Sequence, residues 1–304
     1  FLKDNQLPYG EFIMEACLYS NQSLDNLYYK EEYCLVDSTT GNTAFLGLAL
    51  NELNHEEIDE IINKSSIFLL SEQKEKGIWN FFTNDSLFYG SIPEDTDDTS
   101  FVSRFLIMNN ISFENNTEIF EENIKDGLIQ TWIVKEDNEF YGEYDCNVNV
   151  NVLTYLASIN KDNLIDSNNY NCCIYCENGE SGKIPLFLFY NIAKSLEKNS
   201  CFEDSKEIII TEILDLQKDD GSFGSPIYTS FAITSLIEMG HPIDSYNLKK
   251  SVRYLLNNQN KDGSWGNDFL FSSFGEGPPY MDINEYWTWG SSELSTALAL
   301  ESLN

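Results

Sequence analysis

Four carboxylates stand close together in the segment EDTDDTS, residues 94–100: Glu94, Asp95, Asp97 and Asp98. Like charges at this spacing repel one another, and an apolar surrounding adds desolvation, so one carboxyl can keep its proton at neutral pH. Such a neutral carboxyl beside ionised neighbours could act as a proton donor, and the group would titrate as a cluster. An exposed acidic turn or a calcium loop is the alternative, although the spacing does not fit an EF-hand.

Polar residues at helical spacing could support these acids. Asp97, Phe101 and Arg104 would share about one face of a helix, with Arg104 as a structural counter-ion. Asn147 and Asn151 also share a helix face, and buried amides need hydrogen-bond partners. They either bond the acid cluster or tie neighbouring helices together.

Aromatic side chains could stabilise a cation and keep water from it. The aromatic candidates near the acids are Trp79, Phe81, Phe82, Trp132, Tyr228, Phe231, Trp287 and Trp289. An aromatic residue at helical spacing is more often part of a core than of a ligand site, and this alternative stays open for each.

The elements that must position these residues are helices, because apolar residues recur with helical spacing and strand-like alternation is scarce. The predicted helices span 9–20, 39–53, 56–72, 97–110, 115–125, 146–160, 164–176, 185–197, 204–217, 227–239, 245–258 and 291–303. Six segments are apolar and rich in small residues, as buried helices are: 43–53, 101–108, 147–159, 184–193, 227–239 and 291–303. We therefore predict an all-α (α/α)6 barrel, or toroid, of six inner and six outer helices in one domain, residues 1–304. The inner helices would start at one mouth, which carries segments 37–42, 95–100, 145–149, 224–230 and 287–293.

An internal repeat accompanies this pattern. The form Q-x-x-x-G-x-aromatic occurs at 73–79, 217–223 and 259–265, and weaker relatives occur at 124–132 and 179–185. The glycines at 77, 127, 182, 221 and 263 suit turns that need a positive φ.

The repeat resembles the QW repeat of the squalene–hopene cyclase and terpenoid cyclase superfamily. DTDDTS (95–100) resembles the D-x-D-D-T signature of its class II members, which start cyclisation by protonating an alkene. DCNVNVNVL (145–153) and WGSSELSTALALESL (289–303) resemble inner-helix segments of that family. The resemblance covers most of residues 73–304, and the chain length suits a monodomain form.

The resemblance implies roles for individual residues. Asp97 would be the proton donor, Asp95 would orient or polarise it, and Asp98 would hold the neighbouring network. Thr99 would cap the helix or hydrogen-bond the carboxylates. The family's repeat tryptophan is usually a structural brace, which implies the same for Trp79, Phe223 and Trp265. A histidine often partners the acid in the family, but His55 and His241 are remote, so an asparagine or tyrosine would serve here.

The implied activity is that of a class II terpene cyclase, which converts a linear isoprenoid or prenylated substrate to a cyclic product by protonation, a cation cascade and deprotonation. No redox cofactor is expected. Mg²⁺ is expected only with a prenyl diphosphate. Arginine is scarce, with Arg104 and Arg253 the two in the sequence, which favours a neutral head group, although a few well-placed lysines would suffice for a diphosphate. No metal site is predicted, because no ligand pair faces the cluster of Cys172, Cys173 and Cys176.

Three alternatives remain. A zinc prenyltransferase β subunit would need an Asp/Cys/His site, and neither histidine has suitable neighbours. A carbohydrate-active (α/α)6 enzyme would use paired carboxylates, but would not explain the repeat. A non-catalytic toroid would bind an isoprenoid or lipid without converting it.

Charge and cysteine content limit the partners. The net charge is −32, from 50 acidic and 18 basic residues, which excludes nucleic acid as a ligand. Seven cysteines, an odd number, indicate reduced thiols and a cytoplasmic protein. No run of about 18 apolar residues occurs, so no transmembrane segment is predicted. Peripheral contact with a membrane and the oligomeric state stay open.

Overall fold

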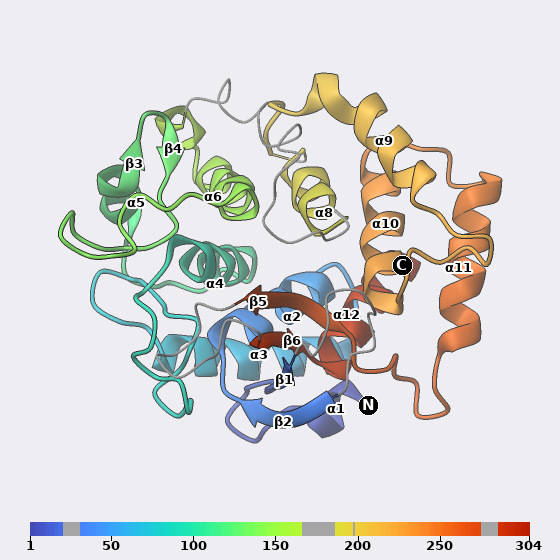
Figure 1. Ribbon diagram of the computed structural model, residues 1–304, viewed down its shortest axis with the longest axis horizontal. Coiled ribbons are helices and arrows are strands. Elements are labelled where there is room, and N and C mark those ends of the chain that lie inside the picture. Colours follow the sequence, from blue (N-terminus) through green and yellow to red (C-terminus); the bar gives the residue numbers. More distant parts are fainter. Residues whose placement is uncertain (21–30, 166–185, 197, 275–284) are drawn as a thin grey trace.

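Six helices form a closed ring at the centre of the computed structural model, which describes residues 1–20, 31–165, 186–196, 198–274 and 285–304. Each ring helix packs against the next in chain order, and the last packs against the first (Figure 1). The ring helices are α2 (Thr40–Leu50), α4 (Thr96–Met108), α6 (Cys146–Ser158), α8 (Leu186–Ser195), α10 (Pro226–Glu238) and α12 (Ser292–Leu303). They correspond to the six segments predicted as inner helices.

Ring helices pack closely because small residues leave room between them. Nearly every residue of α2 is buried, as expected for a helix that is apolar on all sides. A side chain at Gly47 would collide with the ring of Phe105 on α4. Glycine at this position therefore lets α2 and α4 approach each other.

Outer helices cover parts of the ring. Helix α3 (Glu56–Ser71) packs on α2, whereas α9 (Lys206–Asp215) and α11 (Tyr246–Asn258) pack on α10 (Figure 1). Helix α11 buries one face, with Leu248, Ser251 and Leu255, as an amphipathic outer helix should. The remaining helical segments are α1 (Leu2–Asn5), α5 (Thr117–Asn123), and the 3₁₀ helices η1 (Asp162–Leu164) and η3 (Glu203–Ser205). Most of the predicted helix 164–176 lies outside the described residues.

The predicted helix 9–20 is wrong, and so is the all-α class. Residues Met14–Ser20 form strand β1 of a four-stranded antiparallel sheet with the order β2-β1-β6-β5. The other strands are β2 (Glu31–Asp37), β5 (Phe269–Phe274) and β6 (Glu285–Gly290). Pairing with a strand some 270 residues away decides the conformation of β1, and short-range periodicity carries no signal of such pairing. A two-stranded hairpin of β3 (Ile124–Lys125) and β4 (Leu128–Ile129) turns at Gly127.

The described residues thus form the predicted ring of inner helices together with a small sheet. The predicted complete set of six outer helices stays a proposal.

The repeat has a common hydrogen-bond pattern. In the three copies at 73–79, 217–223 and 259–265, the aromatic residue donates its backbone N–H to a threonine hydroxyl on a ring helix: Trp79 to Thr99 at 3.1 Å, Phe223 to Thr229 at 3.1 Å and Trp265 to Thr296 at 3.0 Å. Phe12 makes the same bond to Thr43 at 3.0 Å. The segment QLPYGEF, residues 6–12, is therefore a further copy, which the sequence analysis missed.

The glycines and tryptophans of the repeat have the predicted structural roles. Gly77, Gly127, Gly221 and Gly263 all have positive φ, and Gly182 lies outside the described residues. The indole of Trp79 donates to the carbonyl of Leu69 at 2.7 Å, and that of Trp265 donates to Leu255 at 2.9 Å. Each tryptophan thus braces the outer helix that precedes it.

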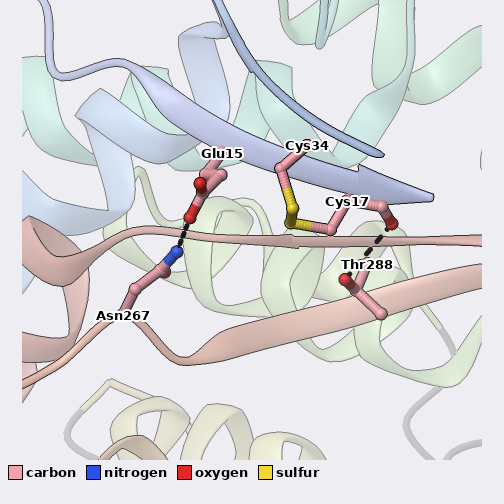
Figure 2. The surroundings of a disulfide bond; sticks show 5 residues. All are labelled: Glu15, Cys17, Cys34, Asn267 and Thr288. Carbon is pink, nitrogen blue, oxygen red and sulfur yellow. Dashed lines mark hydrogen bonds between the residues drawn. A yellow bond between two sulfur atoms is a disulfide. The ribbon is translucent and has the colours of Figure 1, made fainter. Parts of the chain in front are cut away.

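A disulfide joins Cys17 of β1 to Cys34 of β2, which lie opposite each other in the sheet (Figure 2). The prediction of reduced cysteines is wrong for this pair. Strand pairing creates the contact, and the spacing of the two cysteines along the chain does not reveal it. Cys172, Cys173 and Cys176 lie outside the described residues. Among the helices that are described, none combines the length and apolarity needed to cross a membrane.

Candidate active site

The acid segment forms the start of α4. Asp95 is the N-cap residue, and its Oδ1 accepts a hydrogen bond from the backbone N–H of Asp98 at 2.7 Å. A later segment of the same chain adds a hydrogen bond at this start, from the N–H of Thr96 to the carbonyl of Thr131 at 2.8 Å. Asp97 and Asp98 consequently lie in the first helical turn, where the helix dipole favours negative charge.

Asp95 and Asp98 are a buried pair, 3% and 7% exposed. When both acids are ionised, Oδ2 of Asp95 has no hydrogen-bond donor among the described residues. A protonated Asp98 can donate a hydrogen bond to the carboxylate of Asp95. Burial and the negative charges of Asp95 and Asp97 raise the pKa of Asp98 well above its usual value. Burial raises the pKa of Asp95 to about 6, against hydrogen bonds that lower it. The pair therefore holds a proton, and an exposed acidic turn is excluded.

Gly41 on α2 allows this crowding. A side chain there would collide with Oδ1 of Asp98 and would lie 3.4 Å from the ring of Phe81. The backbone of α2 therefore forms one wall around Asp98.

Asp97 is the more accessible acid, since it is only partly buried. Its Oδ1 accepts a hydrogen bond from Nδ2 of Asn151 at 2.9 Å. Burial and the charge of Asp95 raise the pKa of Asp97 to about 7, whereas the Asn151 hydrogen bond and the Arg104 charge act in the opposite direction. A large fraction of Asp97 is thus protonated at neutral pH.

Arg104 acts on Asp97 through Asn151. Its Nη1 donates to Oδ1 of Asn151 at 2.7 Å, which turns the amide nitrogen toward Asp97. Of the two interpretations of the asparagines, Asn151 therefore bonds the acid cluster. Asn149 faces away and bonds the backbone of Ile129 at 2.9 and 3.0 Å. Oδ1 of Asn147 is buried and has no hydrogen-bond partner in the described part of the chain.

Two residues of the segment do not join the acid cluster. Glu94 pairs with Lys74 at 2.7 Å, and this pairing lowers its pKa in spite of burial. Thr99 is fully buried, and its hydroxyl bonds the backbone of Trp79. The predicted hydrogen bond from Thr99 to the carboxylates is therefore wrong.

A cavity of about 120 Å³ lies inside the ring and begins one turn beyond Asp97. Phe45, Phe101, Arg104 and Tyr190 line it. Residues near the C-terminal ends of ring helices complete the wall: Leu48, Glu52, Ile107, Met108, Thr154, Ser158, Asn191, Lys194 and Lys198. The cavity therefore extends away from the helix starts, which include the acid segment.

Aromatic rings cluster around Phe45 in the ring interior. Its ring centroid lies 5.2 Å from that of Phe101, 5.8 Å from Tyr190 and 6.2 Å from Phe231. Tyr228 lies 6.4 Å from Phe231, so Phe101, Tyr228 and Phe231 belong to one cluster. Phe45 and Tyr190 on the cavity wall, and Phe187 with its ring centroid 5.7 Å from that of Phe45, were missed as site residues. They lie in segments predicted as inner helices, but a helix that is apolar on all sides does not reveal which face points inward.

The predicted tryptophans do not line the cavity. Trp287 and Trp289 lie on β6, and Trp289 packs on Phe81 at 5.6 Å and Phe82 at 5.5 Å. The sheet thereby covers the side of the ring where Phe81 adjoins Gly41. Trp132 pairs through its backbone with Asp95, while its indole donates to Glu143 at 2.6 Å. Of these three residues, Trp132 therefore holds the acid segment through its backbone.

The described residues bring three potential metal ligands together at Glu15, Cys17 and Cys34. Two of them are joined in the disulfide, and Mg²⁺ prefers oxygen ligands. The group does not fit a magnesium ion (Figure 2).

Solved structures align with this chain. A protein from Actinoplanes superposes with a TM-score of 0.72 at 17% identity, covering 99% of this chain and 95% of that chain. The type II terpene cyclase MstE from Scytonema, bound to geranylgeranyl dihydroxybenzoate, gives 0.65 at 13% identity, with 99% and 93% covered. Ent-copalyl diphosphate synthase from Streptomyces platensis gives 0.56 at 15% identity, with 87% and 50% covered. No protein-family model and no curated protein matches the sequence. At these identities the likeness concerns the fold.

Proposed function

Because the chain has a class II terpene cyclase-like fold, we propose that it is a protonation-initiated cyclase of a linear isoprenoid or prenylated molecule. The observation that carries the proposal is the position of Asp97. This acid lies one helical turn, about 6 Å along the axis, from Phe101 on the cavity wall. Burial and the charge of Asp95 raise its pKa to about 7. A protonated carboxyl beside an aromatic chamber is what alkene protonation requires.

In the proposed reaction, Asp97 gives its proton to a carbon–carbon double bond and leaves a tertiary carbocation. The hydrogen bond from Asn151 and the charge of Arg104 stabilise the carboxylate that forms. Further double bonds of the chain then attack the cation and close rings. The faces of Phe45, Phe101 and Tyr190 stabilise the positive charge, and the reaction ends when a proton is lost.

The contacts of two cavity cations, Arg104 and Lys194, favour a substrate without a diphosphate. Arg104 is bonded to Asn151, and Lys194 contacts Glu52 and Glu301 at 2.6 and 2.9 Å. A diphosphate would have to compete with these partners. MstE was solved with a prenylated dihydroxybenzoate, which supports the same substrate class. The proposed reaction uses no redox cofactor and no metal ion, and Mg²⁺ dependence would accompany a diphosphate substrate.

Substrate entry requires side-chain movement. The cavity of about 120 Å³ is smaller than the roughly 300–1,000 Å³ of typical ligand sites. Met108 on its wall is unbranched and 44% exposed, so it can change rotamer to admit a longer chain.

The test is an assay of the purified protein with farnesyl and geranylgeranyl diphosphate and with neutral prenylated arenes and geranylgeranyl dihydroxybenzoate. We expect a cyclic isomer by mass spectrometry, and a loss of about a hundredfold or more in Asp97→Asn. Asp59→Asn removes the same charge from the exposed side of α3 and serves as the control. Undiminished turnover in Asp97→Asn would show that this acid is not the proton donor.

A non-catalytic isoprenoid-binding toroid is the second candidate, because Asp97 itself does not line the described cavity. It predicts that these ligands bind, as seen by a thermal shift, and are recovered unchanged.

A further inference from the structure

A buried hydrogen-bonded network lies on the wall of the cavity, on other helices than the acids. Tyr190 of α8 lines the cavity and donates its hydroxyl to Oε2 of Glu301 on α12 at 2.9 Å. The Glu301 side chain is 2% exposed, and its Oε1 lies 2.9 Å from Nζ of Lys194. Three helix-borne groups thus converge at one point of the cavity wall.

Glu301 is suited to accept a proton. Burial raises its pKa to about 6, while Lys194 and the Tyr190 hydroxyl favour the ionised form. It is therefore a carboxylate at neutral pH, but a stronger base than an exposed glutamate. Lys194 also contacts Glu52 at 2.6 Å and Glu238 at 3.5 Å. The carboxylates of Glu301 and Glu52 raise its pKa in spite of burial. The Lys194 ammonium group is consequently charged at neutral pH.

The network is linked to the acid site by one series of aromatic rings. Phe101 lies one turn from Asp97 and packs on Phe45, and Phe45 packs on Tyr190. All three rings line the same cavity. A positive charge created beside Asp97 and moved along the chamber would therefore reach Tyr190.

We propose that Tyr190 and Glu301 form the base that ends the cyclisation. This inference rests on the proposed function. Tyr190 Oη takes a proton from the carbon next to the final cation, while its own hydroxyl proton passes to Glu301. The carbon–hydrogen bond breaks, its electron pair forms the double bond of the product, and Glu301 becomes a neutral acid.

The proton balance closes through solvent. Glu301 later releases its proton toward water at the rim of the network, where Glu52 and Glu238 are 43% and 36% exposed. Asp97, which is partly exposed, regains a proton independently. Substrate and product are then isomers, and no other reactant is consumed.

The network could instead be a structural clasp of α8 and α12, so the test must follow the product. Tyr190→Phe keeps the ring and removes the hydroxyl, and Glu301→Gln keeps the shape and removes the base. We expect both variants to consume substrate within about tenfold of the wild-type rate. The ratio of the wild-type alkene to alternative alkenes and water-trapped alcohols should fall at least tenfold, as measured by mass spectrometry and NMR.

Tyr155→Phe is the matched control. Tyr155 is also buried on a ring helix and donates its hydroxyl, to Asn116 at 2.6 Å, but it does not line the cavity. It should lower the melting temperature without changing the products. Thermal melts of all three variants separate loss of structure from loss of the base.

The outcomes are distinct. An unchanged product ratio in both Tyr190→Phe and Glu301→Gln overturns the inference and leaves a clasp. If Tyr190→Phe does not fold, Glu301→Gln decides by the same ratio. If the wild-type protein consumes none of the substrates, the proposed function fails and this inference fails with it.

Discussion

Asn151 on α6 holds Asp97 on α4 by two hydrogen bonds from one amide nitrogen. Nδ2 lies 2.9 Å from the carboxyl Oδ1 and 3.1 Å from the backbone carbonyl of Asp97. The amide orientation is fixed, because Arg104 donates to the amide oxygen at 2.7 Å. Since Oδ1 of Asp97 accepts this bond, the carboxyl proton resides on Oδ2. The contact with Asn151 on α6 thus selects Oδ2 of Asp97 as the proposed proton-donating atom.

Asn151→Leu should weaken the acid. It removes the donor that stabilises the carboxylate of Asp97 and leaves Arg104 without that acceptor. A hydrogen bond to a charged group contributes about 1.5–3 kcal/mol, so we expect turnover to fall about tenfold to a hundredfold. The falling limb of the pH–rate profile should move to higher pH, because the pKa of Asp97 rises. A limb that stays in place would mean that this bond does not act on the reacting acid.

Activity should fall as the pH rises through about 7, because Asp97 donates only when protonated. Above that pH we expect kcat/KM to drop about tenfold per unit. Asp95→Asn keeps an N-cap acceptor but removes the charge that repels the Asp97 carboxylate. The falling limb of this variant should therefore move to lower pH. Profiles of both proteins on one substrate measure the shift, and coinciding profiles would contradict the coupling.

Stability should rise as the pH is lowered from 8 to 5. The folded-state pKa values of Asp95 and Asp97 are about 6 and 7, above the ordinary value of 3.8. The two acids contribute fully to the free energy of unfolding below about pH 4, where they are protonated in the folded and the unfolded protein alike. This contribution is lost as the pH rises through 6 and 7. Urea unfolding at several pH values measures the free energy of unfolding.

Asp98→Asn should raise the free energy of unfolding at pH 8, because burial and the charges of Asp95 and Asp97 raise the pKa of Asp98 well above its usual value. The amide can donate to Asp95 as the protonated acid does, without a proton being taken up on folding. The pH dependence between 5 and 8 should also become weaker. A variant that is less stable than the wild type at pH 8 would show that Asp98 is not held neutral.

Gly41→Ala should disturb the acid pair from the side of α2. The added methyl group would collide with Oδ1 of Asp98, so we expect a loss of about 1–3 kcal/mol in stability together with reduced turnover. Gly266→Ala is the control, because nothing lies within 4 Å of a side chain at that position. Thermal melting and the cyclisation assay compare the two. Equal behaviour would mean that the backbone of α2 does not confine Asp98.

The sequence by itself determined the ring helices and the acid segment. Apart from 164–176, most of which lies outside the described residues, the helices from 39–53 onward appear where apolar spacing places them, because that spacing is local and each helix makes its own hydrogen bonds. The start of α4 was also determined locally, because the side chain of Asp95 caps the helix by accepting the backbone N–H of Asp98, three residues later. The turns of the repeat follow from glycine, which adopts positive φ at little cost.

Only the tertiary structure decided which residues meet. Strand β1 exists because β6 pairs with it from the far end of the chain, and the Cys17–Cys34 disulfide follows from strand register. The contacts of Asn151 with Asp97 and Arg104, and of Tyr190 with Glu301, join helices more than 40 residues apart. Periodicity places a residue on a helix, but packing alone selects the face that points into the ring, because ring helices are apolar on every side.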